Sequence, residues 1–196
     1  MQVPNEAKRQ AILKAARVAF TRKPFHEVKL DDVAATARVG KGTIYVYFDN
    51  KDHLYVELVT AAMEELLSDL RLLADEADES GGPVWPIVET CVAKVAAWTA
   101  KHPKIFDMMR SGVLGERAAA MRKRRREMGE LLGRVLTRAA KLGETNDPHP
   151  AVTANFIPAM ARAGVVWGPG ELGAEALRSH ILQLLTSGIR ANGRKR

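Results

Sequence analysis

The amino-acid sequence predicts an all-α fold of about nine helices, and three observations support this prediction. Apolar residues recur three or four positions apart through most of the 196 residues, which is the spacing of one helix face. No run long enough to predict a half-buried β-strand alternates apolar and polar residues. Glycine and proline gather at 81–83, 143–150 and 168–170, where we expect helices to end.

Apolar stripes mark three helices in the later part of the chain. The stripes consist of Tyr55, Val59, Met63, Leu66, Leu70, Leu73 and Ala77; of Met128, Leu132, Val135, Ala139 and Leu142; and of Leu177, Ile181, Leu184 and Gly188. Gly143 suits the C′ position after the second stripe, because glycine adopts the left-handed backbone common at helix ends. Pro158 lies in a further apolar stretch and should kink that helix, since proline lacks a backbone donor.

The first fifty residues divide into three short helices. We expect them at about 5–22, 30–36 and 40–48, with Asn5 as the N-cap of the first and Asn50 as the N-cap of a long fourth helix. Two short helices joined by a tight turn and supported by a preceding helix form a helix-turn-helix arrangement. The sequence therefore predicts an N-terminal three-helix helix-turn-helix domain followed by a C-terminal helical bundle.

The net charge of +7 is unevenly spread over these two predicted domains. The helix-turn-helix domain, residues 1–49, carries +4. Within the bundle, residues 50–196, the segment 50–115 carries −5 and the segment 116–142 carries +6. The helix-turn-helix domain, called the head below, is thus basic and is followed by an acidic segment. This charge pattern indicates that the head binds a polyanion.

The composition predicts a soluble, cytoplasmic protein. Hydrophobic residues make up 46% of the chain and charged residues 27%, as in folded globular domains. No apolar run approaches the ~18 residues that cross a bilayer, and the N-terminus lacks the apolar segment of a secretory signal. The single cysteine, Cys91, cannot form an intrachain disulfide and is expected to be a buried thiol rather than a redox sensor.

No catalytic or metal-binding pattern is visible. The five histidines lack metal-ligand spacing, and no nucleophile is paired with a base. The glycines around Lys41 do not form a phosphate loop, because the full loop pattern and a preceding strand are missing. We therefore expect no metal, no cofactor and no enzyme activity.

Four segments of the head together resemble the DNA-binding domain of the TetR family of transcription regulators. They read AILKAARVAF at 11–20, LDDVA at 30–34, VGKGTIYVYF at 39–48 and NKDHL at 50–54. The resemblance extends over roughly the first 60 residues, in the helix-turn-helix region, and is most specific from 39 to 54. The rest of the chain resembles the family only in the number and length of its helices.

The residue types of the third helix suit DNA on physical grounds. Lys41 and Gly42 open this helix, where backbone N–H groups and the positive end of the dipole favour a phosphate. Gly42 lets a DNA strand approach closely, and Thr43 can contact a base edge or a phosphate. Tyr47 and Lys51 suit the phosphate backbone.

The resemblance implies DNA contacts at Thr43, Tyr47 and Lys51. The full set of predicted DNA-binding residues is Lys29, Gly40, Lys41, Gly42, Thr43, Tyr47 and Lys51. Lys29 either reaches a phosphate or is an exposed surface lysine. We expect Ile44, Tyr45 and Phe48 to be core residues that hold the three helices together.

Three positions of the head depart from the family pattern. Val28 and Lys29 stand where the family has a hydroxyl residue to cap the second helix, a loss of roughly 1 kcal/mol. Arg38 replaces the turn glycine, and Gly40 replaces a serine. These changes leave the fold intact and alter the individual DNA contacts.

The resemblance also implies a ligand pocket and a dimer interface in the bundle. Candidate ligand-binding residues are Trp98, Phe106, Met109, Met128, Phe156, Met160 and Trp167, each of which could instead be ordinary core. Candidate dimer-interface residues are Leu177, Ile181, Leu184 and Gly188. The last two helices, at about 150–167 and 171–191, contain small residues that permit close packing on a partner chain.

The predicted function is a DNA-binding transcriptional regulator. The main hypothesis is a homodimeric repressor that a small-molecule effector releases from a palindromic, double-stranded operator, with no membrane partner. One alternative is an activator or a regulator that needs no ligand. The other is an all-helical enzyme or lipid-binding protein whose basic head serves another purpose.

The densest charge run, residues 122–126, leaves three interpretations open. It is a solvated helix face, or it reaches a phosphate of flanking DNA, or one or two of its arginines point inward and bind an anionic effector. The last interpretation follows from periodicity. Arg124 and Arg125 occupy the turn between Met121 and Met128, so one guanidinium should start on the buried side.

Overall fold

The computed structural model describes residues 5–111, 117–168 and 173–189. Within these ranges every regular element is helical, which confirms the all-α prediction. The elements are α1 (Glu6–Arg22), the 3₁₀ turn η1 (Phe25–Glu27), α2 (Leu30–Ala37), α3 (Lys41–Tyr47), α4 (Lys51–Glu79), α5 (Trp85–Lys101), α6 (Lys104–Ser111), α7 (Arg117–Lys141), α8 (Pro150–Trp167) and α9 (Ala174–Gly188).

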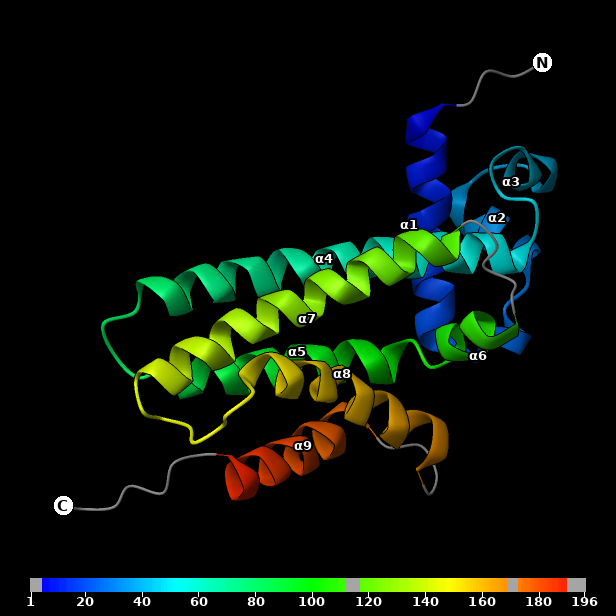
Figure 1. Ribbon diagram of the computed structural model, residues 1–196. Coiled ribbons are helices and arrows are strands. Elements are labelled where there is room, and N and C mark those ends of the chain that lie inside the picture. Colours follow the sequence, from blue (N-terminus) through cyan, green and yellow to red (C-terminus); the bar gives the residue numbers. More distant parts are fainter. Residues whose placement is uncertain (1–4, 112–116, 169–172, 190–196) are drawn as a thin grey trace.

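The helices form a head and a body joined by α4. Helices α1, α2 and α3 gather at one end of α4, with α1 lying across it (Figure 1). In the body, α4 packs along α7, α7 packs on α8, and α5 lies against both α8 and α9. Helix α9 lies on the far side of the body from α4 (Figure 1).

The head has its own apolar core. It is formed by one face of α1, by side chains from α2, α3 and the first turn of α4, and by one residue before α2 and one after α3: Ile12, Leu13, Ala15, Ala16, Val28, Val33, Ala34, Ile44, Phe48 and Leu54. From Tyr55 onward the buried face of α4 belongs to the larger core of the body. One continuous helix therefore contributes to both cores.

The ends of the head helices follow the predicted chemistry. The Asn5 side chain accepts hydrogen bonds from the N–H groups of Ala7 and Lys8, and Asn50 caps α4 by accepting from His53. Helix α2 begins at Lys29 with no side-chain cap, as predicted. These caps satisfy backbone donors that the first turn of a helix leaves unpaired.

Arg38 ends α2 in the left-handed conformation, with φ 56°. This backbone is favourable for glycine and costs roughly 1–2 kcal/mol for other residues. The N–H groups of Arg38 and Val39 donate to carbonyls of the last turn of α2, so the turn closes as a helix C-cap. The head keeps the turn geometry without the glycine.

The first two apolar stripes of the body are buried with two exceptions. Leu73 is only half-buried, and Leu142, the last residue of the second stripe, is 40% exposed. Leu142 lies just beyond the end of α7, so it no longer follows the helical periodicity that predicted its burial. Gly143 adopts φ +73°, which confirms its C′ role, and α8 remains helical on both sides of Pro158.

Candidate DNA-binding surface and ligand cavity

Helix α3 is fixed to the head by two fully buried side chains. Ile44 and Phe48 are spaced four residues apart, so both point from one face of the helix into the head core. Gly40, Lys41 and Gly42 are exposed, and Thr43 is half-buried. A Cβ placed on Gly42 would meet no other atom within 4 Å, so the backbone is open to an approaching strand.

The expected core position of Tyr45 is wrong. Its side chain is 48% exposed, as is that of Val46. Helical geometry gives the reason: Tyr45 is four residues after Lys41, so it shares the outward face rather than the face of Ile44. This spacing was the signal that could have placed Tyr45 on the candidate DNA-binding surface.

Lys41 projects from this surface but is paired within the head. Its ammonium lies 2.9 Å from the Oδ1 atom of Asp31 at the start of α2. The hydrogen bond from Lys41 to Asp31 raises the pKa of the lysine, and the charge of the carboxylate adds to the effect. Both side chains are largely exposed, so a phosphate can compete for this lysine.

Tyr47 ties α3 to the start of α1. Its hydroxyl accepts a hydrogen bond from the Asn5 N–H at 2.8 Å and donates to the Asn5 carbonyl at 3.2 Å. A hydroxyl has one proton and two acceptor sites, so the donor is already in use. In the described structure Tyr47 thus orients α3 relative to α1. Its contact with a DNA phosphate stays a prediction.

Lys51 is directed into the head rather than toward solvent. Its ammonium donates to the carbonyls of Phe25, His26 and Val28 at 2.9, 3.3 and 3.1 Å, and lies 4.6 Å from the centre of the Phe25 ring. An ammonium has three donors, and all three are directed at carbonyls of η1 and the residue that follows it. The phosphate contact predicted for Lys51 would need these bonds to be exchanged.

Lys29 has the properties of a surface cation available to DNA. It is exposed, and it forms no ion pair or side-chain hydrogen bond with another described residue. It is the N-cap residue of α2, the helix that precedes α3 in the chain. Of the three lysines predicted to contact DNA, Lys29 is the one that would break no existing bond by doing so.

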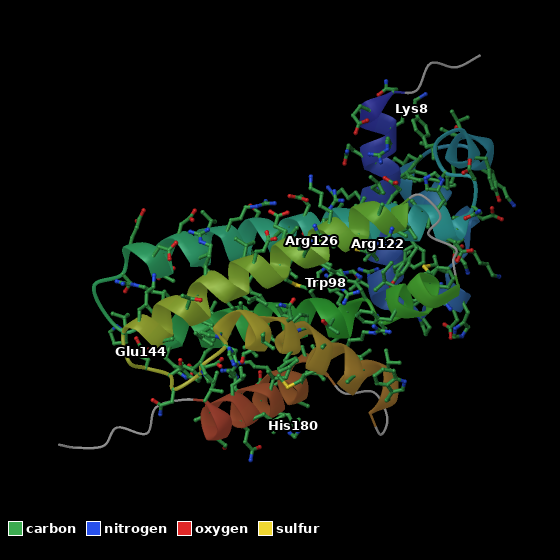
Figure 2. All side chains as sticks on the ribbon, viewed as in Figure 1. Lys8, Trp98, Arg122, Arg126, Glu144 and His180 are labelled. Atoms are coloured by element: carbon green, nitrogen blue, oxygen red, sulfur yellow. The ribbon has the colours of Figure 1, made fainter. Side chains whose placement is uncertain are left out.

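A cavity of about 190 Å³ lies in the body. Five helices contribute to its wall: α4 through Met63, α5 through Trp98 and Thr99, α6 through Ile105 and Phe106, α7 through Met121, Arg125 and Met128, and α8 through Pro158, Ala159, Arg162 and Trp167. Figure 2 shows Trp98 inside the body, between α5 and α7. The wall is mostly apolar, with a few polar groups, as in many small-molecule sites.

The structure brings together four of the seven predicted ligand-binding residues. Trp98, Phe106, Met128 and Trp167 line the cavity. The other predictions need correction. Phe156 is 55% exposed on the outer face of α8, and Met160 packs beside the core without lining the cavity, because helical rotation turns both away from Ala159 and Arg162. The side chain of Met109 lies outside the described residues.

Sequence reasoning missed Arg162, which lines the cavity from α8. Its guanidinium carbon lies 5.7 Å from the centre of the Phe106 ring and 5.9 Å from that of Trp167, within cation–π range. Its Nε atom is buried and has no hydrogen-bond partner, and the same is true of Trp98 Nε1. One arginine within the otherwise apolar α8 was the available signal.

The basic run on α7 is divided among different surroundings. Arg124 pairs with Glu64 of α4 at 3.3 Å, Arg125 lines the cavity, and Arg126 lines a groove between α7 and α8. Of the run only Arg124 is half-buried; the other four residues, Arg125 at the cavity included, are exposed, and Figure 2 shows Arg122 and Arg126 along α7. The run is therefore neither wholly a solvated face nor wholly directed inward.

His102 is a buried titratable group where the body meets the head. Its ring lies 5.3 Å from that of Trp98, at the C-terminal end of α5. The pKa of His102 is lowered to about 4, mainly by burial and also by the charges of Lys101 and Arg17, while Glu65 acts in the opposite direction. His102 is thus neutral at neutral pH.

The predicted dimer residues divide into two pairs. Leu177 and Ile181 are buried within the chain itself, on the face of α9 that packs against α5, so they belong to its own core and correct our expectation. Leu184 is 48% exposed, and Gly188 is exposed. The exposed apolar side chains Val152, Phe156 and Trp167 lie on one face of α8.

The described part of the chain holds neither a candidate membrane-spanning helix nor a cluster of metal-ligating side chains. No helix there is long and apolar enough to cross a membrane. No group of three or more histidine, cysteine, aspartate and glutamate side chains in these residues could hold a metal ion. Cys91 is buried on α5, and this burial raises the pKa of its thiol to about 12.

Comparison with known proteins agrees with this architecture. The family model described as bacterial regulatory proteins, tetR family, matches residues 12–58. The regulator YhgD of Bacillus subtilis is 35% identical over 102 residues, which span 50% of this chain and 51% of YhgD. A TetR/AcrR-family regulator from Thermobifida fusca superimposes with a TM-score of 0.70 at 25% identity, covering 98% of this chain and 100% of that one.

A third relative was solved with a ligand. FadR of Bacillus subtilis, in complex with stearoyl-CoA, superimposes with a TM-score of 0.61 at 20% identity, and the match covers 93% of this chain and 100% of the FadR chain.

The fold and the head define a helix-turn-helix DNA-binding protein with a helical body. Residues 12–58 match the tetR family of bacterial regulatory proteins, a family of DNA-binding transcriptional regulators, and the whole chain has the fold of a solved TetR/AcrR-family regulator.

Proposed function

We propose that this protein is a homodimeric repressor that a small-molecule effector releases from a palindromic operator. The observation that carries the proposal is the continuity of α4 between head and cavity. Leu54 packs in the head core, and Met63 on the same helix lines the cavity. A ligand that moves the cavity wall therefore also moves the support of α3.

Helix α6 provides a second connection. Phe106 lines the cavity, and Lys104, two residues earlier, lies 5.7 Å from the ring of Phe25 in the head. A small rearrangement of the cavity can thus be transmitted along two helices. A coupling of about 1–3 kcal/mol between ligand and DNA would weaken operator binding roughly 5- to 150-fold.

We place the DNA contacts on the exposed face of the head. Thr43 would read a base edge, and Gly40, Lys41 and Gly42 would allow the backbone to approach α3. Lys29 would contact a phosphate, and the same role for Tyr47 and Lys51 requires exchange of the hydrogen bonds that each makes within the head.

We place the dimer interface on the outer faces of α8 and α9. Exposed apolar side chains on a helix pair are well suited to a second copy of the chain. Phe156 is 55% exposed and Trp167 is 70% exposed on α8, and Leu184 is exposed on α9. Two heads held by such a dimer would reach successive major grooves, about 34 Å apart.

Selection of binding sites from random DNA with the full-length protein tests the proposed function. The expected result is a palindrome with half-sites about one helical turn apart, protected in a footprint. Thr43→Ala should change the preferred bases, and Thr90→Ala, at an exposed threonine of α5 in the body, is the matched control. Selection of no sequence over random DNA would contradict the proposal.

Light scattering of a charged variant tests the dimer interface. Leu184→Arg would place an unpaired charge in the interface, at a cost of several kcal/mol, and should yield monomers. Leu72→Arg is the matched control, because Leu72 is an exposed leucine on α4, away from α8 and α9. A folded Leu184→Arg dimer that still binds the operator would place the interface elsewhere.

A further inference from the structure

We propose that the cavity of the body takes a small organic anion: an apolar body of one ring or a short chain that carries a single carboxylate. The inference rests on the proposed function in so far as it treats this cavity as the effector site. It adds the chemical class of the effector. The argument comes from the polar groups of the wall, from its apolar part and from its size.

The polar groups of the cavity wall are almost entirely hydrogen-bond donors. Arg125, Arg162 and the indole of Trp98 can only donate, and Thr99 contributes the one hydroxyl. Among the described residues, no aspartate, glutamate, asparagine or glutamine lines the cavity. A ligand that fits these groups must offer acceptor atoms, and two guanidinium groups favour one that is negatively charged.

Two of these donors have no partner although they are buried. The Nε atom of Arg162 and the Nε1 atom of Trp98 make no hydrogen bond. A buried polar atom without a partner is unfavourable, and such atoms are uncommon in folded proteins. Both belong to side chains that line the same cavity, on α8 and α5. A bound carboxylate has two oxygens and can accept from more than one of them.

The two cavity arginines differ from Arg124 on α7, Arg71 on α4 and Arg134 on α7 in lacking a carboxylate partner. Arg124 pairs with Glu64, and Arg71 and Arg134 each pair with two acidic side chains. In the described part of the chain, Arg125 and Arg162 form no ion pair. Arg162 is instead held beside the rings of Phe106 and Trp167. These aromatic contacts hold the guanidinium in place and leave its charge uncompensated.

The rest of the wall defines the body of the ligand. Met63, Ile105, Met121 and Met128 provide apolar contacts, and methionine side chains adapt to ligands of different shape. The volume of about 190 Å³ corresponds to roughly six water molecules at ~30 Å³ each. Pockets for drug-sized ligands have volumes of about 300–1,000 Å³, so this smaller cavity suits a single ring or a short chain.

Calorimetric titration of the full-length protein without DNA tests the inference. The probes are benzoate and hexanoate, with benzamide, hexanamide and benzylamine as uncharged and cationic controls of matched shape. A carboxylate that is held by a guanidinium should bind at least about tenfold more tightly than its amide, because hydrogen bonds between charged groups are the stronger ones. Equal or tighter binding of the amides or the amine would overturn the inference, as would no binding of either carboxylate at millimolar concentration.

Three variants locate the binding site. Arg162→Gln should weaken carboxylate binding about 10- to 100-fold and leave amide binding little changed. Trp98→Phe keeps the aromatic ring but removes the donor, and should weaken binding by a smaller factor. Arg122→Gln is the matched control, because Arg122 is exposed on α7 and does not line the cavity.

Further variants and folding controls distinguish a loss of anion binding from a loss of folding. Arg162→Lys keeps the positive charge, so it should retain part of the preference for carboxylate over amide, whereas Arg162→Gln should lose it. Circular dichroism and thermal unfolding of each variant establish that it is folded. If folded Arg162→Gln and Arg125→Gln both bound benzoate as the unaltered protein does, the cavity would not be the anion site.

Operator release separates this inference from the proposed function. If benzoate binds through Arg162 but leaves the protein on its operator, the anion site stands and the release mechanism fails. If a neutral compound binds the cavity and releases the operator, the regulator stands and the inference about anions fails.

Discussion

Lys51→Met is the substitution that most directly tests the structure of the head. The sequence predicts that Lys51 contacts a DNA phosphate, whereas the structure directs its ammonium at the carbonyls of Phe25, His26 and Val28. Methionine keeps most of the length of the side chain and removes the three donors. The substitution therefore separates a role in holding η1 from a role in DNA binding.

The expected loss of stability is about 2 kcal/mol. Hydrogen bonds from a charged donor contribute roughly 1.5–3 kcal/mol, and the contact with the Phe25 ring adds about 0.5–1 kcal/mol. Two opposing effects reduce the sum. Water can reach the carbonyls of η1 after the change, and a positive charge in the first turn of α4 is unfavourable by up to about 1 kcal/mol.

Thermal and urea unfolding of the full-length protein measure this loss. For a chain of this size, about 2 kcal/mol lowers the melting temperature by roughly 4–8 °C. Lys29→Met is the control, because Lys29 is exposed and unpaired among the described residues, and it should change stability by less than about 0.5 kcal/mol. Unaltered stability of Lys51→Met, together with a salt dependence of DNA binding reduced by about 0.9 per half-site, would refute the structural reasoning and support the phosphate contact.

Two further predictions concern the charges of the head and the body. The folded-state pKa of His102 is about 4, below its ordinary value, because burial favours the neutral ring. The contribution of this residue to the free energy of unfolding is therefore fully present above about pH 6.5, and about 3 kcal/mol of it is lost between pH 6.5 and 4. His102→Asn should flatten urea unfolding against pH in this window, and an unchanged pH dependence would contradict the assignment. Asp31→Asn removes the partner of Lys41 and should strengthen operator binding at low salt by about 1 kcal/mol, or roughly fivefold. Weaker binding of a folded Asp31→Asn would show that the ion pair orients α3.

Local sequence signals predicted several of the helix ends. Asn5 and Asn50 are N-caps, Gly143 is a C′ residue with positive φ, and the second helix lacks a side-chain cap. These features depend on hydrogen bonds within one turn of helix, so a short stretch of sequence contains the information. The specific pattern of 39–54 likewise predicted the family, because its residues lie close together in the chain.

The sequence was less informative about residues whose neighbours are distant in the chain. Lys51 looks like a surface lysine, yet carbonyls some 25 residues earlier surround its ammonium. Met160 and Phe156 have the same apolar character as Trp167, and only the last of the three lines the cavity. Phe156 and Trp167 share a face of α8, so which of them lines the cavity depends on their positions along the helix relative to α5, α6 and α7.

The sequence by itself determined that this protein is helical, that its head is a TetR-type helix-turn-helix domain, and which residues cap its helices. Only the tertiary structure decided that Leu177 and Ile181 belong to the core while Leu184 is exposed, and that Arg162 and Trp98 meet in one cavity. The physical reason is the range of the interactions. Periodicity and capping act over a few residues, whereas burial and the shape of a cavity are set by the packing of helices that are far apart in the chain.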